Sequence, residues 1–372
     1  MKVAGVVAAL TKVAPPQFAE SWDNVGLIVG SATGDVRKLL VCVDVTAEVL
    51  AEAARVKAQM ILAHHPLLFK ATQCVRPDST PLVYEAVRRG VAVYCLHTNF
   101  DAAPGGTSDL LAEALKLKNV RPLRPGAGRE QCKIVVFVPP EGLSQVTDAA
   151  FSAGAGRVGN YYDCAFFSHG IGAFCGEEAT DPAVGRAGEH EVVEEIRLEV
   201  VCPRAKAAAV CAAVRAAHDY DEPVIDVYPL DDLPSGWGQG RVGELHRPAT
   251  MPTLVARVKK ALGLPKVLVA GRPGRAGGAR RANLVSTVAC AAGAGRSLVS
   301  DARAAGAGLY VTGELGHHDA LDAAEAGLTV VALGHGNSER PAMRRLAEQL
   351  GKTLPKLKVA YAKSDCDPLE VV

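Results

Sequence analysis

The stretch "KLLVCVDVTAEVLAEAARVKAQMILAHHPLLF", residues 38–69, decides the fold because its pattern changes twice. The apolar run 38–45 is typical of a buried strand, and 47–58 has the composition and spacing of a helix. A second apolar run, 59–65, ends in two adjacent histidines. The order strand, helix, strand predicts a βαβ unit of a parallel sheet.

The two histidines at the end of this unit, His64 and His65, have two interpretations. Neighbouring side chains of an extended chain point to opposite faces, so a plain strand would separate the two rings. In the first, a strand-end turn happens to contain two histidines; in the second, the chain bends at Pro66 and both rings reach one site. The remainder of the sequence has to distinguish these interpretations.

The same alternation continues through the outer thirds of the chain. A helix closed by Gly90 precedes a strand at 91–101, and further strands are predicted at 283–290, 306–314 and 327–335, with helices between them. The two outer thirds therefore predict one discontinuous α/β domain, residues 1–128 with 236–372.

The middle third, residues 129–235, has a different order of elements. Its elements alternate as βαβ and then βαβ again, which is typical of a ferredoxin-like α+β domain. The Pro/Gly-rich stretches 121–128 and 233–240 flank this insert and are predicted to be hinges. The elements expected in the insert are strands at 133–139, 194–203 and 222–230, helices at 143–154 and 205–218, and a hairpin in 162–176.

Composition and charge exclude several classes of protein. The 372 residues contain 41 Lys and Arg against 40 Asp and Glu, so nothing suggests a polyanion surface over the whole chain. No apolar run reaches the ~20 residues of a membrane span, and residues 1–16 are interpreted as an amphipathic helix rather than a signal peptide. The ten cysteines contain no CxxC, which favours buried, reduced thiols in a cytoplasmic protein.

Metal-ligating residue types recur where predicted strands end. In open α/β sheets, ligands bind beyond the carboxyl ends of the strands, so these ends can meet. A single His at a strand end is usually a turn or core residue. Three strand ends that each carry His or carboxylate side chains, however, offer more ligands than one tetrahedral zinc ion needs. The set suits two ions about 3.5–4 Å apart. The ends are His64-His65, "HTNFD" with His97 and Asp101, and "GHGNSE" with His335 and Glu339 at helical spacing i, i+4.

The order and spacing of several motifs resemble a known family. "WDNVGLIVG", "LAHHPLLF", "HTNFDAAPGGTSDLLAEAL", "TGELGHHDAL" and "GHGNSE" are similar to motifs of the NGG-one-interacting-factor-three-like family, whose bacterial members are often labelled GTP cyclohydrolase I type 2 homologs. "GRVGNYYDCAFFSHGIGAF" and "HDYDEPVIDVYPL" resemble the PII/CutA-like insert of that family's long form.

The resemblance implies a dinuclear centre in a toroidal homohexamer whose metal sites face an inner cavity. Two divalent ions per chain are expected. Because the ligands are imidazoles and carboxylates without thiolate, Zn, Fe, Mn, Co and Ni all suit the site. His64 and His65 are expected to bind one ion each. The implied ligands are His64, His65, Asp101, His335 and a bridging Glu339.

Two functions are carried forward. The first is a metal-dependent hydrolase acting on a small molecule, for which the family label implies opening of the guanine imidazole ring of GTP. In this function His97 either contacts the substrate or moves a proton; the alternative is that it only orients Asp101. The second is a hexameric adaptor that senses a small ligand through its insert.

Residues near the expected site leave further alternatives open. One of Glu314, His317 and His318 is expected to face the metals. The alternative is that these residues are exposed to solvent at the start of a helix. Asp23 is interpreted mainly as a turn residue, and the family likeness leaves a role at the edge of the pocket open. The stretch 290–297 is either a plain strand-to-helix turn or a phosphate cradle. The basic stretch 271–281 is either a solvated loop, the preferred interpretation, or a segment that attracts an anionic substrate.

Overall fold

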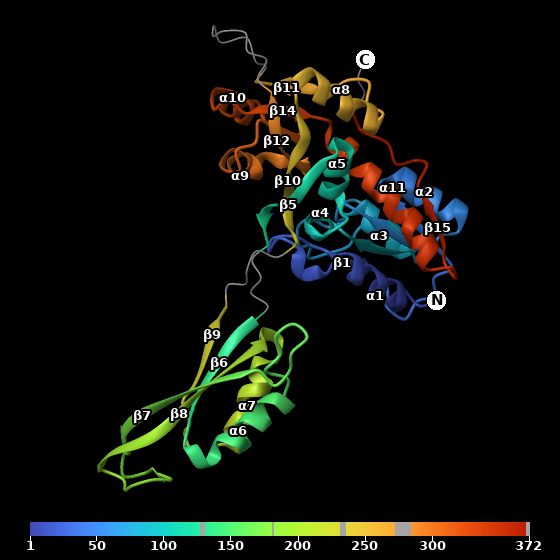
Figure 1. Ribbon diagram of the computed structural model, residues 1–372. Helices are drawn as coiled ribbons and strands as arrows, with labels where there is room; N and C mark the ends of the chain where they lie inside the picture. The colour runs from blue at the N-terminus through green and yellow to red at the C-terminus, as the bar shows by residue number, and fades with distance from the viewer. Residues whose placement is uncertain (127–130, 181, 231–235, 272–283, 370–372) are drawn as a thin grey trace. The chain divides into compact units, whose positions relative to one another are not determined.

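The computed structural model describes residues 1–126, 131–180, 182–230, 236–271 and 284–369. The chain divides into two units (Figure 1): Met1–Gly126 together with Gly236–Val372, called here the α/β unit, and Ala127–Ser235, called the insert. The basic stretch 271–281, apart from Gly271, lies outside the described residues.

The first sheet of the α/β unit contains the βαβ arrangement predicted from residues 38–69. Its strand order is β1-β4-β3-β2-β15, and the pairs β15–β2, β2–β3 and β3–β4 are parallel whereas β1–β4 is antiparallel. Helices α2 (Ala47–Val56) and α3 (Pro81–Arg88) make the crossovers. The strands are β1 (Gly26–Val29), β2 (Lys38–Cys42), β3 (Met60–Ala63), β4 (Ala92–Cys95) and β15 (Lys358–Tyr361).

Local chemistry fixes the ends of α2. The Thr46 side chain accepts a hydrogen bond from the Val49 amide at the start of the helix. Lys57 then takes a left-handed conformation, with φ of 55°, that stops the helix and returns the chain to β3.

Both faces of the first sheet are covered by helices, which explains why β3 and β4 are buried along their whole length. On one face, α1 (Val3–Val13) and α11 (His335–Thr353) pack their apolar side chains against the strands. On the other face, α2 and α3 do the same. The amphipathic helix predicted at the start of the chain is thus present as α1.

Most strands of the last third build a second sheet, whereas β15 joins the first. The second sheet has the order β11-β14-β13-β12-β10-β5, with β12, β13 and β14 parallel and the other pairings antiparallel. Helices α9 (Val299–Ala304) and α10 (His317–Glu325) join the parallel strands. The strands are β5 (Leu117–Pro125), β10 (Gly238–Ala249), β11 (Leu268–Ala270), β12 (Val285–Ala294), β13 (Leu309–Glu314) and β14 (Thr329–Ala332).

The described parts of the two stretches predicted as hinges contain strand: 121–125 belongs to β5 and 238–240 to β10, whereas 127, 128 and 233–235 lie outside the described residues. β5 and β10 pair antiparallel, and Gly238 lies opposite Pro125. The prediction was wrong here because Pro and Gly usually mark loops, whereas β5 is an edge strand, where proline is tolerated.

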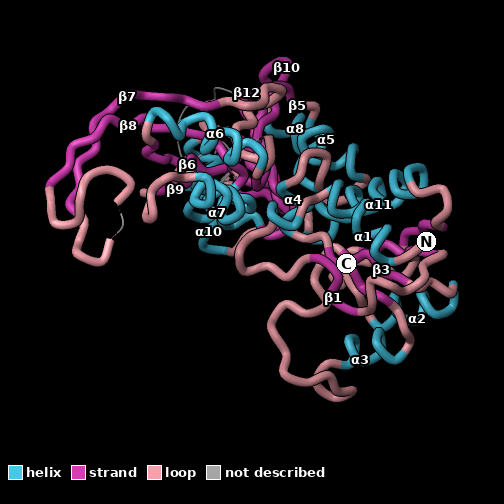
Figure 2. Tube along the Cα trace, turned by 90° about the horizontal axis from the view of Figure 1, so that it is seen from below, coloured by secondary structure: helices cyan, strands magenta, loops and turns pink. Residues whose placement is uncertain are grey.

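The insert has the ferredoxin-like topology predicted for it. Its four strands form an antiparallel sheet in the order β7-β8-β6-β9. Figure 2 shows β7 and β8 continuing as a two-stranded ribbon past the helices. The elements in chain order are β6 (Gln131–Val138), α6 (Leu143–Ser152), β7 (Ala165–Cys175), β8 (His190–Pro203), α7 (Ala207–Ala217) and β9 (Ile225–Pro229).

Two further properties follow from the described residues. Among them, no helix combines the length and apolarity that crossing a membrane would require. The thiols of Cys42, Cys95 and Cys290 are free and buried in the sheets, as the sequence predicted.

Candidate metal centre

The adjacent histidines follow β3, and both rings reach the same site. The amides of His64 and His65 donate to the Val43 carbonyl beyond the end of β2, which ties the turn to the neighbouring strand. Their ring centroids lie 5.2 Å apart. Nδ1 of the fully buried His64 is 2.7 Å from the Leu96 carbonyl oxygen, so this nitrogen carries a proton and Nε2 is the atom that can bind an ion.

Residues from two other segments complete the cluster. Asp101 lies on the short helix α4 (Thr98–Ala102) that follows β4, and its Oδ1 is 3.6 Å from Nε2 of His64. The Thr107 hydroxyl donates to the same carboxylate. His335 begins α11, and Glu339 lies one turn later on the same face, as the spacing of "GHGNSE" predicted.

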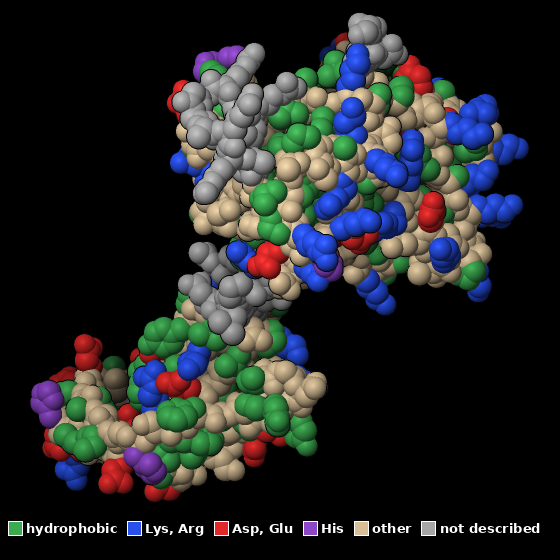
Figure 3. Space-filling view, turned by 45° about the horizontal axis from the view of Figure 1, so that its top comes forward, with side chains coloured by type: hydrophobic (Ala, Val, Ile, Leu, Met, Phe, Trp, Pro, Cys, Tyr) green, Lys and Arg blue, Asp and Glu red, His purple; other side chains and the backbone are tan. Residues whose placement is uncertain are grey.

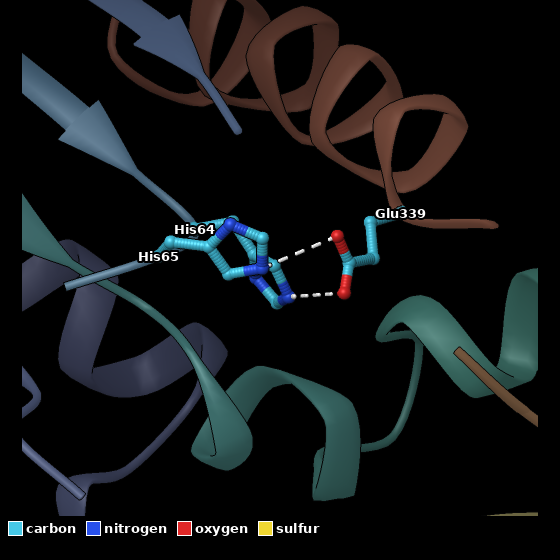
Figure 4. Close-up of side chains that lie close together, drawn as sticks. All are labelled: His64, His65 and Glu339. Carbon is cyan, nitrogen blue, oxygen red and sulfur yellow. Dashed lines mark ion pairs between the residues drawn. The ribbon is translucent and has the colours of Figure 1, made fainter. Parts of the chain in front are cut away.

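The Glu339 carboxylate is the centre of the cluster. Its Oε1 lies 3.6 Å from Nε2 of His64 and 3.2 Å from Nε2 of His335. Its Oε2 lies 3.3 Å from Nε2 of His65 (Figure 4). Nε2 of His335 is also 3.3 Å from Nε2 of His65. One side chain on α11 therefore faces three imidazoles from two parts of the chain.

Two carboxylates contact the imidazoles at Nδ1, the ring nitrogen that does not face Glu339. Nδ1 of His65 lies 2.8 Å from Oδ1 of Asp44, and Nδ1 of His335 lies 3.1 Å from Oε1 of Glu314. Such contacts fix the tautomer and turn each Nε2 toward the cluster. Sequence reasoning missed Asp44; its signal is a carboxylate directly after β2, the strand beside β3.

His317 and His318, the other two residues of which one was expected to face the metals, lie away from the cluster, unlike Glu314. His317 and His318 are exposed at the start of α10, where their rings pack edge to face with centroids 5.5 Å apart. Neither belongs to the described cluster of ligand atoms.

Electrostatics in the cluster favour charged imidazoles around an ionised carboxylate. Burial raises the pKa of Glu339, but the charge of His64 and hydrogen bonds with the imidazoles outweigh it and hold that pKa well below its usual range. Burial lowers the pKa of His65, whereas hydrogen bonds to Asp44 and Glu339 raise it to about 10. The hydrogen bond to Glu339 raises the pKa of His335 to about 9.

The cluster fits a metal ion. Nε2 of His64 and Oε2 of Glu339 are buried, and within the described parts of the chain neither makes a hydrogen bond of regular geometry, although imidazole and carboxylate atoms lie 3.3–3.6 Å apart. Buried polar atoms are nearly always paired, so two orphaned ligand atoms in one cluster are best explained by an ion. Ligand atoms of His64, His65 and Glu339 lie within 4.8 Å of one another and could hold one. Imidazole and carboxylate suit several divalent transition metals.

Gly293 makes room for this cluster. The residue, near the end of β12, has φ of 65°, and a Cβ placed there would lie 2.6 Å from Oε1 of Glu339. Its amide donates to the Ser338 hydroxyl at 2.9 Å. The glycine-rich stretch 290–297 thus contributes by packing against Glu339, and it continues into a 3-10 turn at Gly295–Leu298.

His97 lies beside the cluster and is held by Asp23. Its Nδ1 is 2.8 Å from Oδ1 of Asp23, whose other oxygen accepts the amide and the hydroxyl of Thr98. Burial raises the pKa of Asp23, but the bonds from His97 and Thr98 bring it down to about 2. The His97 ring centroid is 5.4 Å from that of His64. Of the two roles left open for Asp23, the structure favours the one at the edge of the pocket, since its carboxylate orients His97.

The cluster opens into a cavity of about 560 Å³ within the α/β unit. One part of its wall is aromatic, another comes from residues 291–295, 297 and 298, and the candidate ligands lie on a third. Lining residues include Trp22, His65, Phe69, His97, Asp101, Arg124, His335 and Glu339.

The fold and the site define a class: an α/β protein with a candidate metal centre where two sheets meet, interrupted by a ferredoxin-like insert. The chain belongs to the Duf34/NIF3 (NGG1p interacting factor 3) family, whose model matches residues 1–368. The family resemblance stated from sequence motifs is thereby confirmed.

Relatives match along nearly the whole chain. A "GTP cyclohydrolase 1 type 2 homolog" of Halalkalibacterium halodurans is 35% identical and covers 95% of this chain and 94% of its own. The namesake of Mycobacterium tuberculosis is 38% identical with the same coverage. A crystal structure of a Bacillus cereus protein related to NIF3 is 32% identical, with a TM-score of 0.74 over 100% of this chain and 99% of that one. A Staphylococcus aureus structure, 24% identical with a TM-score of 0.81 and the same coverage, shares the fold.

Proposed function

We propose that the chain is a hydrolase dependent on two metal ions. The observation that carries the proposal is the position of Glu339, whose two oxygens face different imidazoles. His64 with Asp101 would hold one ion and His65 with His335 the other, while Glu339 would be shared. Zn, Fe, Mn, Co and Ni all suit this donor set.

When bound, such ions supply a water of lowered pKa and polarise the electrophilic atom of the substrate. The residues of the chain position this chemistry. Asp44 and Glu314 aim the imidazoles, and Asp23 presents His97 at the cavity wall, where its other ring nitrogen can give or take a proton of the substrate.

The substrate proposed here is a nucleotide or a related small molecule. The relatives' name, GTP cyclohydrolase 1 type 2 homolog, supports hydrolytic ring opening of such a compound. A cavity of about 560 Å³ is within the usual range for a small-molecule ligand.

A substrate screen tests the hydrolase. The full chain, loaded with each of the five metals, is incubated with nucleotides, phosphoesters and amides, and products are followed by mass spectrometry. The proposal expects turnover that a chelator abolishes and added metal restores. Absence of metal-dependent turnover across the panel would contradict it.

A second candidate is a ligand-sensing adaptor, favoured by a separate cavity of about 570 Å³ in the insert. Thermal-shift screening with small metabolites distinguishes the two functions. A ligand that stabilises wild type and Glu339→Gln but not Ile171→Glu, a change in the wall of the insert cavity, would favour the adaptor.

For either function we propose that the protein is a homohexamer. Light scattering measures the mass in solution, and the mass of a monomer would contradict this proposal.

A further inference from the structure

Two large aromatic side chains stand exposed in the wall of the metal-centre cavity. Trp22 is 57% exposed and Phe69 is 56% exposed. Their rings are stacked, with centroids 5.8 Å apart and planes inclined by 29°. Nothing in the proposed hydrolysis uses them. Exposed aromatic area beside a candidate active site indicates a binding surface rather than core packing.

The loops that carry these rings are fixed in place. The Asn24 side-chain amide donates to the Leu68 carbonyl at 2.7 Å, which ties the Trp22 loop to the Phe69 loop. The Glu20 amide donates to the Thr98 hydroxyl at 3.0 Å on the other side of Trp22. The pair is therefore preorganised, which lowers the entropic cost of binding.

The imidazole of His97 faces both rings edge-on. Its centroid lies 6.1 Å from Trp22 and 5.9 Å from Phe69, with interplanar angles of 74° and 70°. Because His97 is also 5.4 Å from His64, the aromatic wall continues directly to the ligand cluster. A flat molecule stacked on the exposed face of this aromatic pair would therefore lie beside His97 and the ligand cluster.

The charge of the α/β unit adds a second property. The α/β unit holds 33 Lys and Arg against 22 Asp and Glu, whereas the insert holds 8 Lys and Arg against 18 Asp and Glu. The α/β unit is therefore positively charged and the insert negatively charged, although the net charge of the chain is close to zero. Figure 3 shows Lys and Arg gathered on the visible face of the α/β unit and several acidic side chains on the insert. A positively charged unit raises the local concentration of anionic ligands.

We propose that Trp22 and Phe69 form a ring-binding wall, and that the ligand of the cavity is a planar aromatic ring carrying negative charge. The inference rests on the proposed function in one respect: the ligand described here is taken to be the substrate of the proposed hydrolase. The ring stacks on Trp22 and Phe69, and its charged substituent is attracted by the basic unit.

Guanosine monophosphate, adenosine monophosphate and ribose 5-phosphate are the probes, since the last keeps the sugar phosphate and lacks the ring. The sequence contains two tryptophans, so Trp237→Phe leaves Trp22 as the only one and keeps an aromatic ring against Phe18. Both nucleotides are expected to quench Trp22 fluorescence in the metal-loaded full chain, and ribose 5-phosphate is not.

Calorimetry on variants measures the contribution of the wall. Trp22→Ala and Phe69→Ala should each weaken nucleotide binding by roughly 5- to 150-fold, the effect of losing one stacking contact. Trp22→Phe should retain most of the affinity, and ribose 5-phosphate should bind all forms equally. Phe166→Ala, which removes a 62% exposed phenylalanine in the insert, is the matched control and should change nothing.

Unchanged nucleotide affinity in both alanine variants, or no quenching by either nucleotide, would overturn the inference. Binding is measured without turnover, so the two proposals fail separately. Quenching without hydrolysis of any substrate contradicts the hydrolase and keeps the wall. Hydrolysis of a substrate that binds Trp22→Ala as tightly as wild type contradicts the wall and keeps the hydrolase.

Discussion

Oε2 of Glu339, on the helix that begins at His335, lies 3.3 Å from Nε2 of His65, at the end of β3. This contact joins the first sheet to the segment that follows the last parallel strand of the second sheet. The site thus exists only when both outer thirds of the chain are folded together, although the insert separates them in sequence. Binding of an ion here should therefore stabilise the whole α/β unit.

Asp44→Asn should weaken metal binding at the His65 side of the centre. The carboxylate holds Nδ1 of His65 at 2.8 Å, and loss of such a partner usually costs about 10- to 100-fold in metal affinity. Competition with a chromophoric chelator measures the change. Asp35→Asn, at an exposed carboxylate paired with Lys2, is the control, and an equal effect there would disprove a specific role for Asp44.

Gly293→Ala should reduce metal content as well as stability. The new methyl would meet Oε1 of Glu339 at 2.6 Å and displace the shared carboxylate. Gly327→Ala is a matched control, because Gly327 also has positive φ, of 80°, but a Cβ there meets nothing within 4 Å. Both variants should lose about 1 kcal/mol of stability from backbone strain. Metal content equal in the two variants would contradict the packing role of Gly293.

The metal-free protein should become less stable as pH rises from 6.5 to about 10. The pKa of His65 is raised to about 10 by Asp44 and Glu339, so its charged form stabilises the folded state fully below pH 6.5, and this contribution is lost as pH passes the raised value. Thermal unfolding of chelator-treated wild type and His65→Asn over this range measures the effect. A parallel decline in both proteins would refute it.

Metal binding should show the opposite trend with pH. An ion must displace the protons of His65 and His335, whose pKa values are raised to about 10 and about 9, so affinity should increase with pH and protons should be released on binding. Calorimetry in buffers of different ionisation enthalpy counts these protons. Uptake without proton release at pH 7 would contradict protonated imidazoles in the metal-free cluster.

Sequence patterns were sufficient for features set by local periodicity. The βαβ rhythm of 38–65 and the βαββαβ order of the insert follow from apolar period and turn residues, and the structure has both. The i, i+4 spacing of His335 and Glu339 likewise needed only the helical repeat.

Other features depend on long-range pairing, which a single sequence does not show. The pairing of Gly238 with Pro125 places parts of both predicted hinges in strands, β5 at the edge of the second sheet and β10 beside it. Asp44 supports His65 only because β2 and β3 are neighbours, and Glu314 supports His335 because β13 ends beside α11. The opposite charges of the α/β unit and the insert were hidden because they cancel in the total.

Metal stoichiometry of the full chain tests the central claim most directly. After loading with zinc and removal of excess ion, elemental analysis should find two ions per chain in wild type. His64→Ala and His65→Ala should each retain about one, because each removes a ligand of a different ion, and Glu339→Ala should disturb both. Circular dichroism must show that each variant is folded. Two ions retained at wild-type affinity by folded His65→Ala, or none bound by wild type, would contradict the account.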